Sequence, residues 1–107
     1  MTLVEFLRAR SDEDEVDARR CGADECGVWT TDGSVLDLCQ MDLAVHPAYA
    51  AHMARRDPAR ALVEVEAKRR ITERHASCGG PSPCEDLRLL ALPYAGHADY
   101  RDEWRPS

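Results

Sequence analysis

The stretch DPARALVEVEAKRRITERH, residues 57–75, decides the fold that the sequence predicts. Asp57 suits the N-cap of a helix and Pro58 suits its first position, so we expect a helix over 58–75. Its apolar residues form two stripes on roughly opposite sides: Ala61, Leu62 and Val65 on one, and Val63, Ala67 and Ile71 on the other. A helix that is apolar on two sides lies centrally in its domain or covers its second side with another subunit. The sequence therefore predicts a central helix, with self-association as the alternative.

Further elements are predicted outward from this helix, at 2–20, 28–38, 46–56, 85–92 and 97–105. Thr2 and Glu5 have the spacing of a capping box at the start of the first helix. Asp32-Gly33 indicates a two-residue type I′ turn that closes a β-hairpin near 28–38. The predicted fold class is α+β and mainly α, with three to five short helices around the central helix 58–75.

The composition bounds the domain count and the setting. A chain of 107 residues, of which 32% are charged, predicts a single small domain over 1–107 and no membrane span. The first residues lack the pattern of a signal peptide, so we expect a cytoplasmic protein with reduced thiols. Only 6% of the residues are aromatic, so Leu, Val, Ile and Ala are expected to fill most of the core. His97, Tyr100 and Trp104 share one side of the last segment and are expected to form an aromatic lid on that core.

Five cysteines are a high and odd number for such a chain, which makes metal binding a competitor to unpaired thiols. His75, Cys78 and Cys84 lie within ten positions, between the central helix and the helix at 85–92. Zinc takes four nitrogen or sulfur ligands in structural sites, so we expect a structural zinc on these three residues with Cys39 as the fourth ligand. Cys21, Cys26 and His52 are alternatives for that fourth position. A Cys78–Cys84 disulfide and plain unpaired thiols are the competing interpretations.

Residues 53–76 carry seven basic and four acidic side chains within a chain of net charge −6. This basic segment allows an alternative function, nucleic-acid binding through the helix at 55–74. The residues that would contact phosphates are Arg55, Arg56, Arg60, Lys68, Arg69, Arg70 and Arg74. The acidic overall balance argues against a dedicated nucleic-acid binder, and the same residues can instead face the acidic DEDE run at 12–15.

Three stretches resemble a family of short uncharacterised proteins of actinomycetes and their phages: FLRARSDEDE, HMARRDPARALVEVEAKRRITERH and LRLLALPYAGHADYRDEWRP. The resemblance implies no assigned activity. It implies a His-plus-three-Cys group, since relatives often carry a Cys-x-x-Cys pair and then a Pro-Cys before the Leu-rich helix. His75 and Pro83-Cys84 match that pattern, whereas Cys78 stands alone in place of the pair.

The sequence shows no motif for catalysis. Gly79-Gly80 lacks the Lys and Ser/Thr of a phosphate-binding loop, and His75 with Cys84 is more typical of ligands or spectators than of a nucleophile and its base. We therefore predict a small non-enzymatic interaction or accessory protein, phage-derived by its resemblance. Zinc or homodimerisation would stabilise it, and its protein partner is unknown. The alternative is a nucleic-acid-binding regulatory protein that uses the basic helix 55–74.

Overall fold

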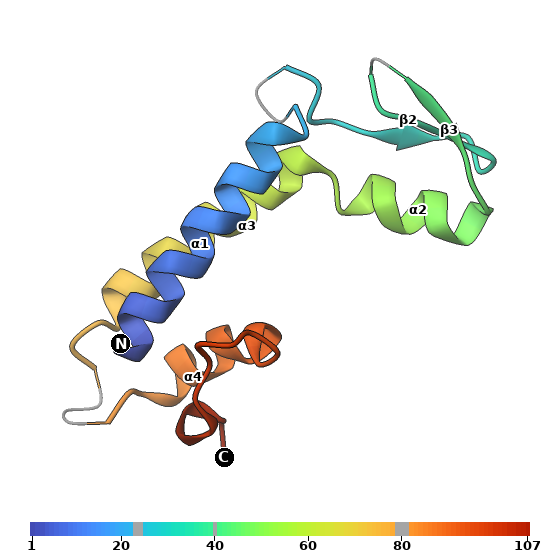
Figure 1. The fold of residues 1–107 in the computed structure, drawn as a ribbon. Coiled ribbons are helices and arrows are strands. Elements are labelled where there is room, and N and C mark those ends of the chain that lie inside the picture. The colour runs from blue at the N-terminus through green and yellow to red at the C-terminus, as the bar shows by residue number, and fades with distance from the viewer. Residues whose placement is uncertain (23–24, 40, 79–81) are drawn as a thin grey trace. The chain divides into compact units, whose positions relative to one another are not determined.

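A computed structural model describes residues 1–22, 25–39, 41–78 and 82–107 of the chain. It confirms an α+β fold that is mainly helical (Figure 1). The elements run in the order α1 Leu3–Arg20, β1 Thr30–Thr31, β2 Val35–Asp37, β3 Asp42–Ala44, α2 Pro47–Arg55, α3 Pro58–Arg74, α4 Glu85–Ala91, and two short 3₁₀ helices, η1 Leu92–Tyr94 and η2 Asp102–Trp104. Among the described residues, no helix is both long and apolar enough to cross a membrane.

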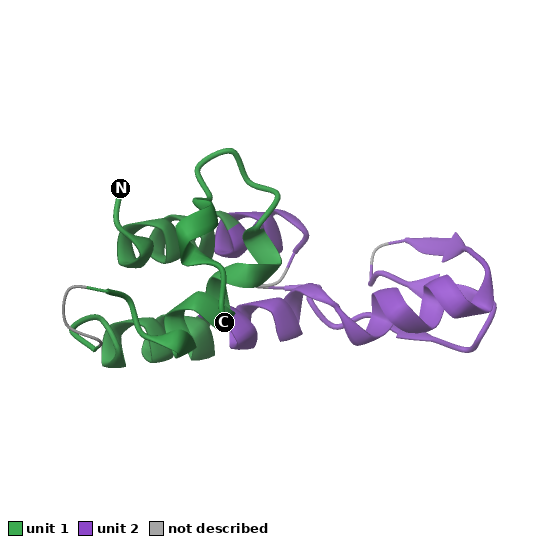
Figure 2. Ribbon diagram, turned by 90° about the horizontal axis from the view of Figure 1, so that it is seen from below, with its two compact units in different colours: residues 1–13, 66–107 green, residues 14–65 purple. Residues whose placement is uncertain are grey.

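The described chain divides into two compact units (Figure 2). Unit 1 contains Met1–Glu13 and Glu66–Ser107, and unit 2 contains Asp14–Val65. The long helices α1 and α3 each give one part to unit 1 and the other part to unit 2. The single domain expected over 1–107 stays a prediction.

The core of unit 1 surrounds Phe6, a residue of α1 that is fully buried. Its ring contacts four aromatic rings at centroid distances of 5.1–6.3 Å, those of Tyr94, His97, Tyr100 and Trp104. The expected aromatic lid therefore exists, and Phe6 is the residue that it covers. Leu3, Leu7, Leu87 and Ala91 complete the buried cluster.

This cluster is built from α1, α4 and η2, and among the described residues no member comes from α3. The sequence had placed the hub of the fold on the helix at 58–75, whereas α1 takes this position in unit 1. Two ion pairs join α3 to α1 within this unit: Arg8 with Glu73 at 2.6 Å and Arg69 with Asp12 at 2.7 Å. Arg69 with Asp12 joins the basic segment of α3 to the acidic run of α1, as the charge pattern had suggested, whereas Arg8 with Glu73 has the opposite sense.

The beginning of α1 follows the predicted capping pattern. The backbone N–H of Glu5 donates to the Thr2 hydroxyl at 3.1 Å, and that hydroxyl donates to the Glu5 carboxylate at 3.1 Å. These bonds satisfy a backbone donor that the first helical turn leaves without a partner. Leu3, Phe6 and Leu7 in the same two turns are thereby fixed on the core side of α1.

Unit 2 contains a three-stranded antiparallel sheet in the order β1-β2-β3. The predicted hairpin forms its first two strands, and β3 was not expected from the sequence. Leu36 pairs with Thr31 on one side and with Leu43 on the other, and its side chain is fully buried. Helix α2 lies against β1 and β2 and contributes the buried Ala50.

The hairpin turn is longer than the predicted two-residue type I′ turn. Thr31 pairs with Leu36, so four residues lie between the paired positions. A type I′ turn needs positive φ at both central residues, and here Gly33 has φ +103° while Asp32 does not have positive φ. The Asp32 carboxylate instead accepts hydrogen bonds from the backbone N–H groups of Ser34 and Val35, which fixes the wider turn.

Helix α3 begins at Pro58 as predicted, with Asp57 as its N-cap. The Asp57 carboxylate accepts the backbone N–H of Arg60 at 2.8 Å and also that of Trp29 at 3.1 Å. The same side chain therefore starts α3 and holds the segment that leads into β1. Of the two apolar stripes of α3, the first contains the buried Val65, whereas Val63 and Ile71 of the second are 70% and 38% exposed.

Candidate metal centre

His75, Cys78 and Cys84 belong to unit 1, at the connection between α3 and α4. The backbone N–H of His75 donates to the Ile71 carbonyl, so His75 continues the last turn of α3. The backbone N–H of Cys78 donates to the His75 carbonyl at 2.9 Å, which folds the chain back by a turn. Cys84 occupies the N-cap position of α4, and its side chain packs against the core cluster.

Arg88 of α4 holds the backbone around Cys84. Its Nε donates to the carbonyl of Pro83 at 3.1 Å, and its Nη1 donates to the carbonyl of Glu103 at 2.7 Å. The position of the Cys84 sulfur therefore depends on the α4 side chain that also fixes the C-terminal segment.

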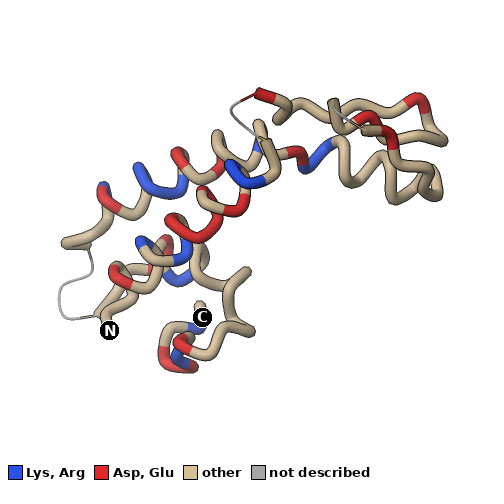
Figure 3. Tube along the Cα trace, turned by 45° about the horizontal axis from the view of Figure 1, so that its top comes forward, with Lys and Arg blue, Asp and Glu red and all other residues tan. Residues whose placement is uncertain are grey.

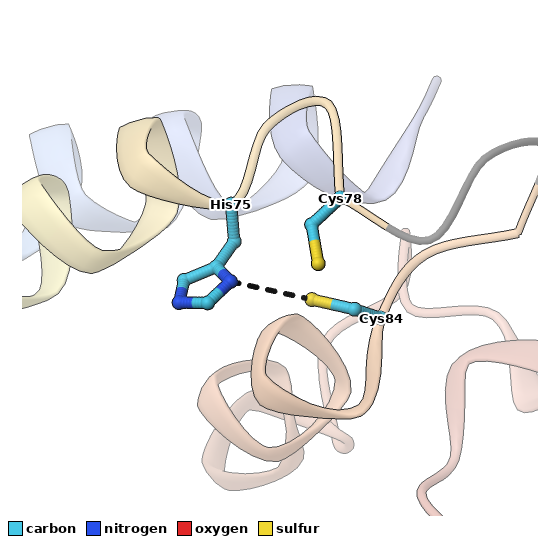
Figure 4. A group of neighbouring side chains, drawn as sticks. All are labelled: His75, Cys78 and Cys84. Atoms are coloured by element: carbon cyan, nitrogen blue, oxygen red, sulfur yellow. Dashed lines mark hydrogen bonds between the residues drawn. The ribbon is translucent and has the colours of Figure 1, made fainter.

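The three side chains point toward one another (Figure 4). Their ligand atoms all lie within 4.8 Å of one another, and Cys84 Sγ lies 3.8 Å from His75 Nδ1. Zn–S bonds of about 2.3 Å and Zn–N bonds of about 2.0–2.1 Å place tetrahedral ligand atoms about 3.5–3.8 Å apart. A contraction of no more than about 1.3 Å in any separation would therefore bring these atoms to zinc-binding distances.

The electrostatics of the group are unfavourable to two thiolates without a cation. The hydrogen bond with Cys84 raises the pKa of the Cys78 thiol above its usual value, and desolvation and the negative charges of Cys84 and Asp86 raise it further. A bound dication would remove this penalty, because it attracts both sulfurs and favours their deprotonated form. The arrangement therefore fits a metal ion that takes thiolate and imidazole ligands, of which zinc is the most common.

Cys39, the predicted fourth ligand, does not join this group. It forms a disulfide with Cys26 in unit 2, and a sulfur in a disulfide is not available as a thiolate ligand. The prediction of Cys39 as a ligand is therefore corrected to a disulfide partner. The remaining thiol, that of Cys21, is exposed. The disulfide was not expected in a chain assigned to a reducing compartment, and the cytoplasmic location stays a prediction.

The basic residues of the alternative function are largely occupied by intramolecular partners. Arg60 pairs with Glu64 one turn later on α3, and Arg70 pairs with Glu66 one turn earlier. Lys68 lies over the ring of Tyr94. Arg69 pairs with Asp12 of α1, while Arg55, Arg56 and Arg74 are exposed. Figure 3 shows acidic and basic positions interleaved along α1 and along α3. Nucleic-acid binding through these residues stays a prediction, and a binding assay at low salt would test it.

A sequence profile of a family of unknown function, DUF6221, matches residues 1–106. The chain belongs to this family. The DUF6221 match spans both units and the His75–Cys84 segment, so the group described above lies inside the family's region. The predicted resemblance to an uncharacterised family is confirmed at this level, and an origin in actinomycetes or phages stays a prediction. No curated protein and no solved structure is significantly similar to the chain.

Asp86 is a charged neighbour of this group to which the sequence had assigned another role. Its Oδ2 lies 3.6 Å from His75 Nε2, on the edge of the imidazole away from the nitrogen that contacts Cys84. The sequence had explained Asp86 only as an acidic residue in the first turn of a helix. Asp86 follows the candidate ligand Cys84 by two residues, and this spacing was the signal in the sequence that it could lie near the group.

Proposed function

We propose that this chain is a small non-enzymatic interaction protein in which a zinc ion fastens the end of α3 to the start of α4. The observation that carries the proposal is the convergence of His75, Cys78 and Cys84 within 4.8 Å. His75 lies at the end of α3 and Cys84 lies at the start of α4, so one ion bound to both would fix the connection between these helices.

The size of the core supports a role for the metal in stability. Six of the described residues form the buried cluster of unit 1, and two of them come from the short helix α4. Small domains with thin cores commonly depend on a disulfide or a metal. Structural zinc contributes about 10–16 kcal/mol of apparent binding energy in finger peptides, so even a fraction of this would hold α4 in place.

An exposed apolar side chain on α3 supports an interaction role. Val63, in the second apolar stripe of α3, lies in unit 2 and is 70% exposed. Large apolar side chains that are exposed on a helix are used in contacts with another chain. A second copy of the chain or another protein would cover Val63. Reduced thiols at the zinc site are the reason to retain a cytoplasmic location in the proposal.

Native mass spectrometry of protein purified without a nickel column tests both parts. We expect one zinc per chain, lost in Cys84→Ser and Cys78→Ser but retained in Cys21→Ser, because Cys21 is an exposed thiol outside the cluster. A chain that takes up no zinc under reducing conditions would end the zinc part of the proposal. A monomer at high concentration would remove self-association, and Val63→Lys should convert a dimer to a monomer if Val63 lies in the contact.

A further inference from the structure

The donor set of the candidate metal centre is one ligand short. Among the described residues, only His75, Cys78 and Cys84 form a group with metal-binding geometry. The stretch GGPSP between the two cysteines contains no Cys, His, Asp or Glu. Cys26 and Cys39 are bonded to each other and supply no thiolate. A tetrahedral ion on this group would therefore have one coordination position without a ligand from the loop or from the disulfide.

The group also lies at the surface. Cys78 is exposed, and the side chain of His75 is 26% exposed. Cys84 is the only one of the three that packs against the core. A donor from outside the chain therefore has access to an ion at this place.

Asp86 does not lie on the metal side of His75. In Figure 4 the nitrogen of His75 that faces Cys84 is Nδ1, and this nitrogen is the one directed toward both sulfurs. When Nδ1 binds a metal, the ring proton must sit on Nε2, which lies 3.6 Å from Asp86 Oδ2. A carboxylate at this place orients the ring, as partners of metal-bound histidines commonly do.

We propose that this chain carries an open metal centre with three protein ligands, His75 Nδ1, Cys78 Sγ and Cys84 Sγ, and with Asp86 as a positioning residue. This inference rests on the proposed function. The fourth position takes an exchangeable neutral nitrogen donor of the imidazole class, such as a histidine side chain of another chain. Two thiolates already neutralise a divalent ion, and Glu85 and Asp86 add negative charge nearby, so a neutral donor is favoured over a further anion.

Cobalt(II) substitution with imidazole as the probe tests this inference on the full-length chain, kept free of oxygen and of added reductant so that the Cys26–Cys39 disulfide stays intact. Cobalt bound by two thiolates and one imidazole gives visible absorption bands that depend on the fourth ligand. We expect the bands to appear at one cobalt per chain and then to shift with a saturating dependence on imidazole. In Asp86→Ala we expect cobalt affinity to fall about 10–100-fold, with the imidazole shift retained. Asp86→Asn should recover part of the loss, because its amide oxygen can still accept from Nε2–H.

Three outcomes would overturn the open centre. Bands that do not respond to imidazole would show a closed site, and bands that vanish would show that imidazole removes the metal. A response in Asp86→Ala but not in the unchanged protein would make Asp86 the fourth ligand. Failure to bind cobalt or zinc at all contradicts the proposed function itself, so the two failures are distinguishable.

Discussion

Replacement of Phe6 by alanine should remove much of the stability of unit 1. The Phe6 side chain is fully buried and its ring contacts four aromatic rings. Burial of about 150–250 Å² by a phenylalanine at about 25 cal/mol per Å² corresponds to about 4–6 kcal/mol. Alanine retains part of this area and the unfolded chain already buries some of it, so we expect a loss of about 3–5 kcal/mol.

Urea unfolding, followed by far-UV circular dichroism and by Trp104 fluorescence, measures this loss. Trp29 belongs to unit 2, so the Trp29→Phe background makes Trp104 the only indole reporter and restricts the signal to unit 1. Phe6→Leu retains most of the apolar volume and should cost about 1–1.5 kcal/mol. Val16→Ala is the matched control on the same helix, because Val16 is 54% exposed and should change the free energy of unfolding by less than about 0.5 kcal/mol.

The decisive comparison is between Phe6→Ala and Val16→Ala. Proteins of this length unfold with a free energy of about 5–16 kcal/mol, so a loss of 3–5 kcal/mol moves the urea midpoint clearly. Equal midpoints for the two variants would refute the assignment of the unit 1 core to Phe6. A midpoint that falls in Phe6→Ala with an unchanged urea slope would support it.

Three further predictions concern unit 2. Asp57→Ala removes the N-cap of α3 and the acceptor for the Trp29 N–H, and should lower stability by about 1–2 kcal/mol in urea unfolding, with Asp57→Asn less affected. The backbone N–H groups of Ser34 and Val35 and the Ser34 hydroxyl donate to the Asp32 carboxyl and hold its pKa below the usual value of 3.8. The stabilising effect of this carboxylate is therefore present above pH 3.8 and is lost as the pH falls through the lower folded-state pKa. An Asp32 carboxyl chemical shift that titrates at or above pH 3.8 would contradict this prediction. With a chelator present to remove bound metal, alkylation should label three thiols without reductant and five with reductant. Reduction of Cys26–Cys39 should cost up to about 3 kcal/mol, and five labelled thiols without reductant would exclude the disulfide.

The helices were predictable because their signals are local. Thr2 with Glu5, and Asp57 with Pro58, define helix starts through contacts between residues three apart or adjacent, and the structure contains both starts. Strand β3 was not predictable, because a three-residue strand has no period of its own and exists through its pairing with β2. The turn has a different cause, which is local: the Asp32 carboxylate accepts the backbone N–H groups of Ser34 and Val35, and these bonds compete with the backbone pattern expected for Asp-Gly.

The candidate site was predictable in part. The spacing of His75, Cys78 and Cys84 along a short connection kept them close whatever the remainder of the chain did. Cys39 lies far from them in the sequence, so its partner depended on the fold, and the fold brings it to Cys26. Zinc binding at the His75, Cys78 and Cys84 group, and contact with a partner or a second copy, are proposals that the experiments above test.

The sequence by itself determined the four α-helices to within one residue at each end, the fold class and the three candidate ligands, because capping, proline positions and short ligand spacings act over a few residues. The segment predicted at 97–105 contains only the short 3₁₀ helix Asp102–Trp104. Only the tertiary structure decided that the core of unit 1 forms around Phe6, that Cys39 pairs with Cys26, and that Asp86 lies beside His75. These are contacts between residues whose distance is set by how elements pack. Periodicity identifies the apolar side of a helix, but which neighbour covers that side depends on burial and shape across the whole unit.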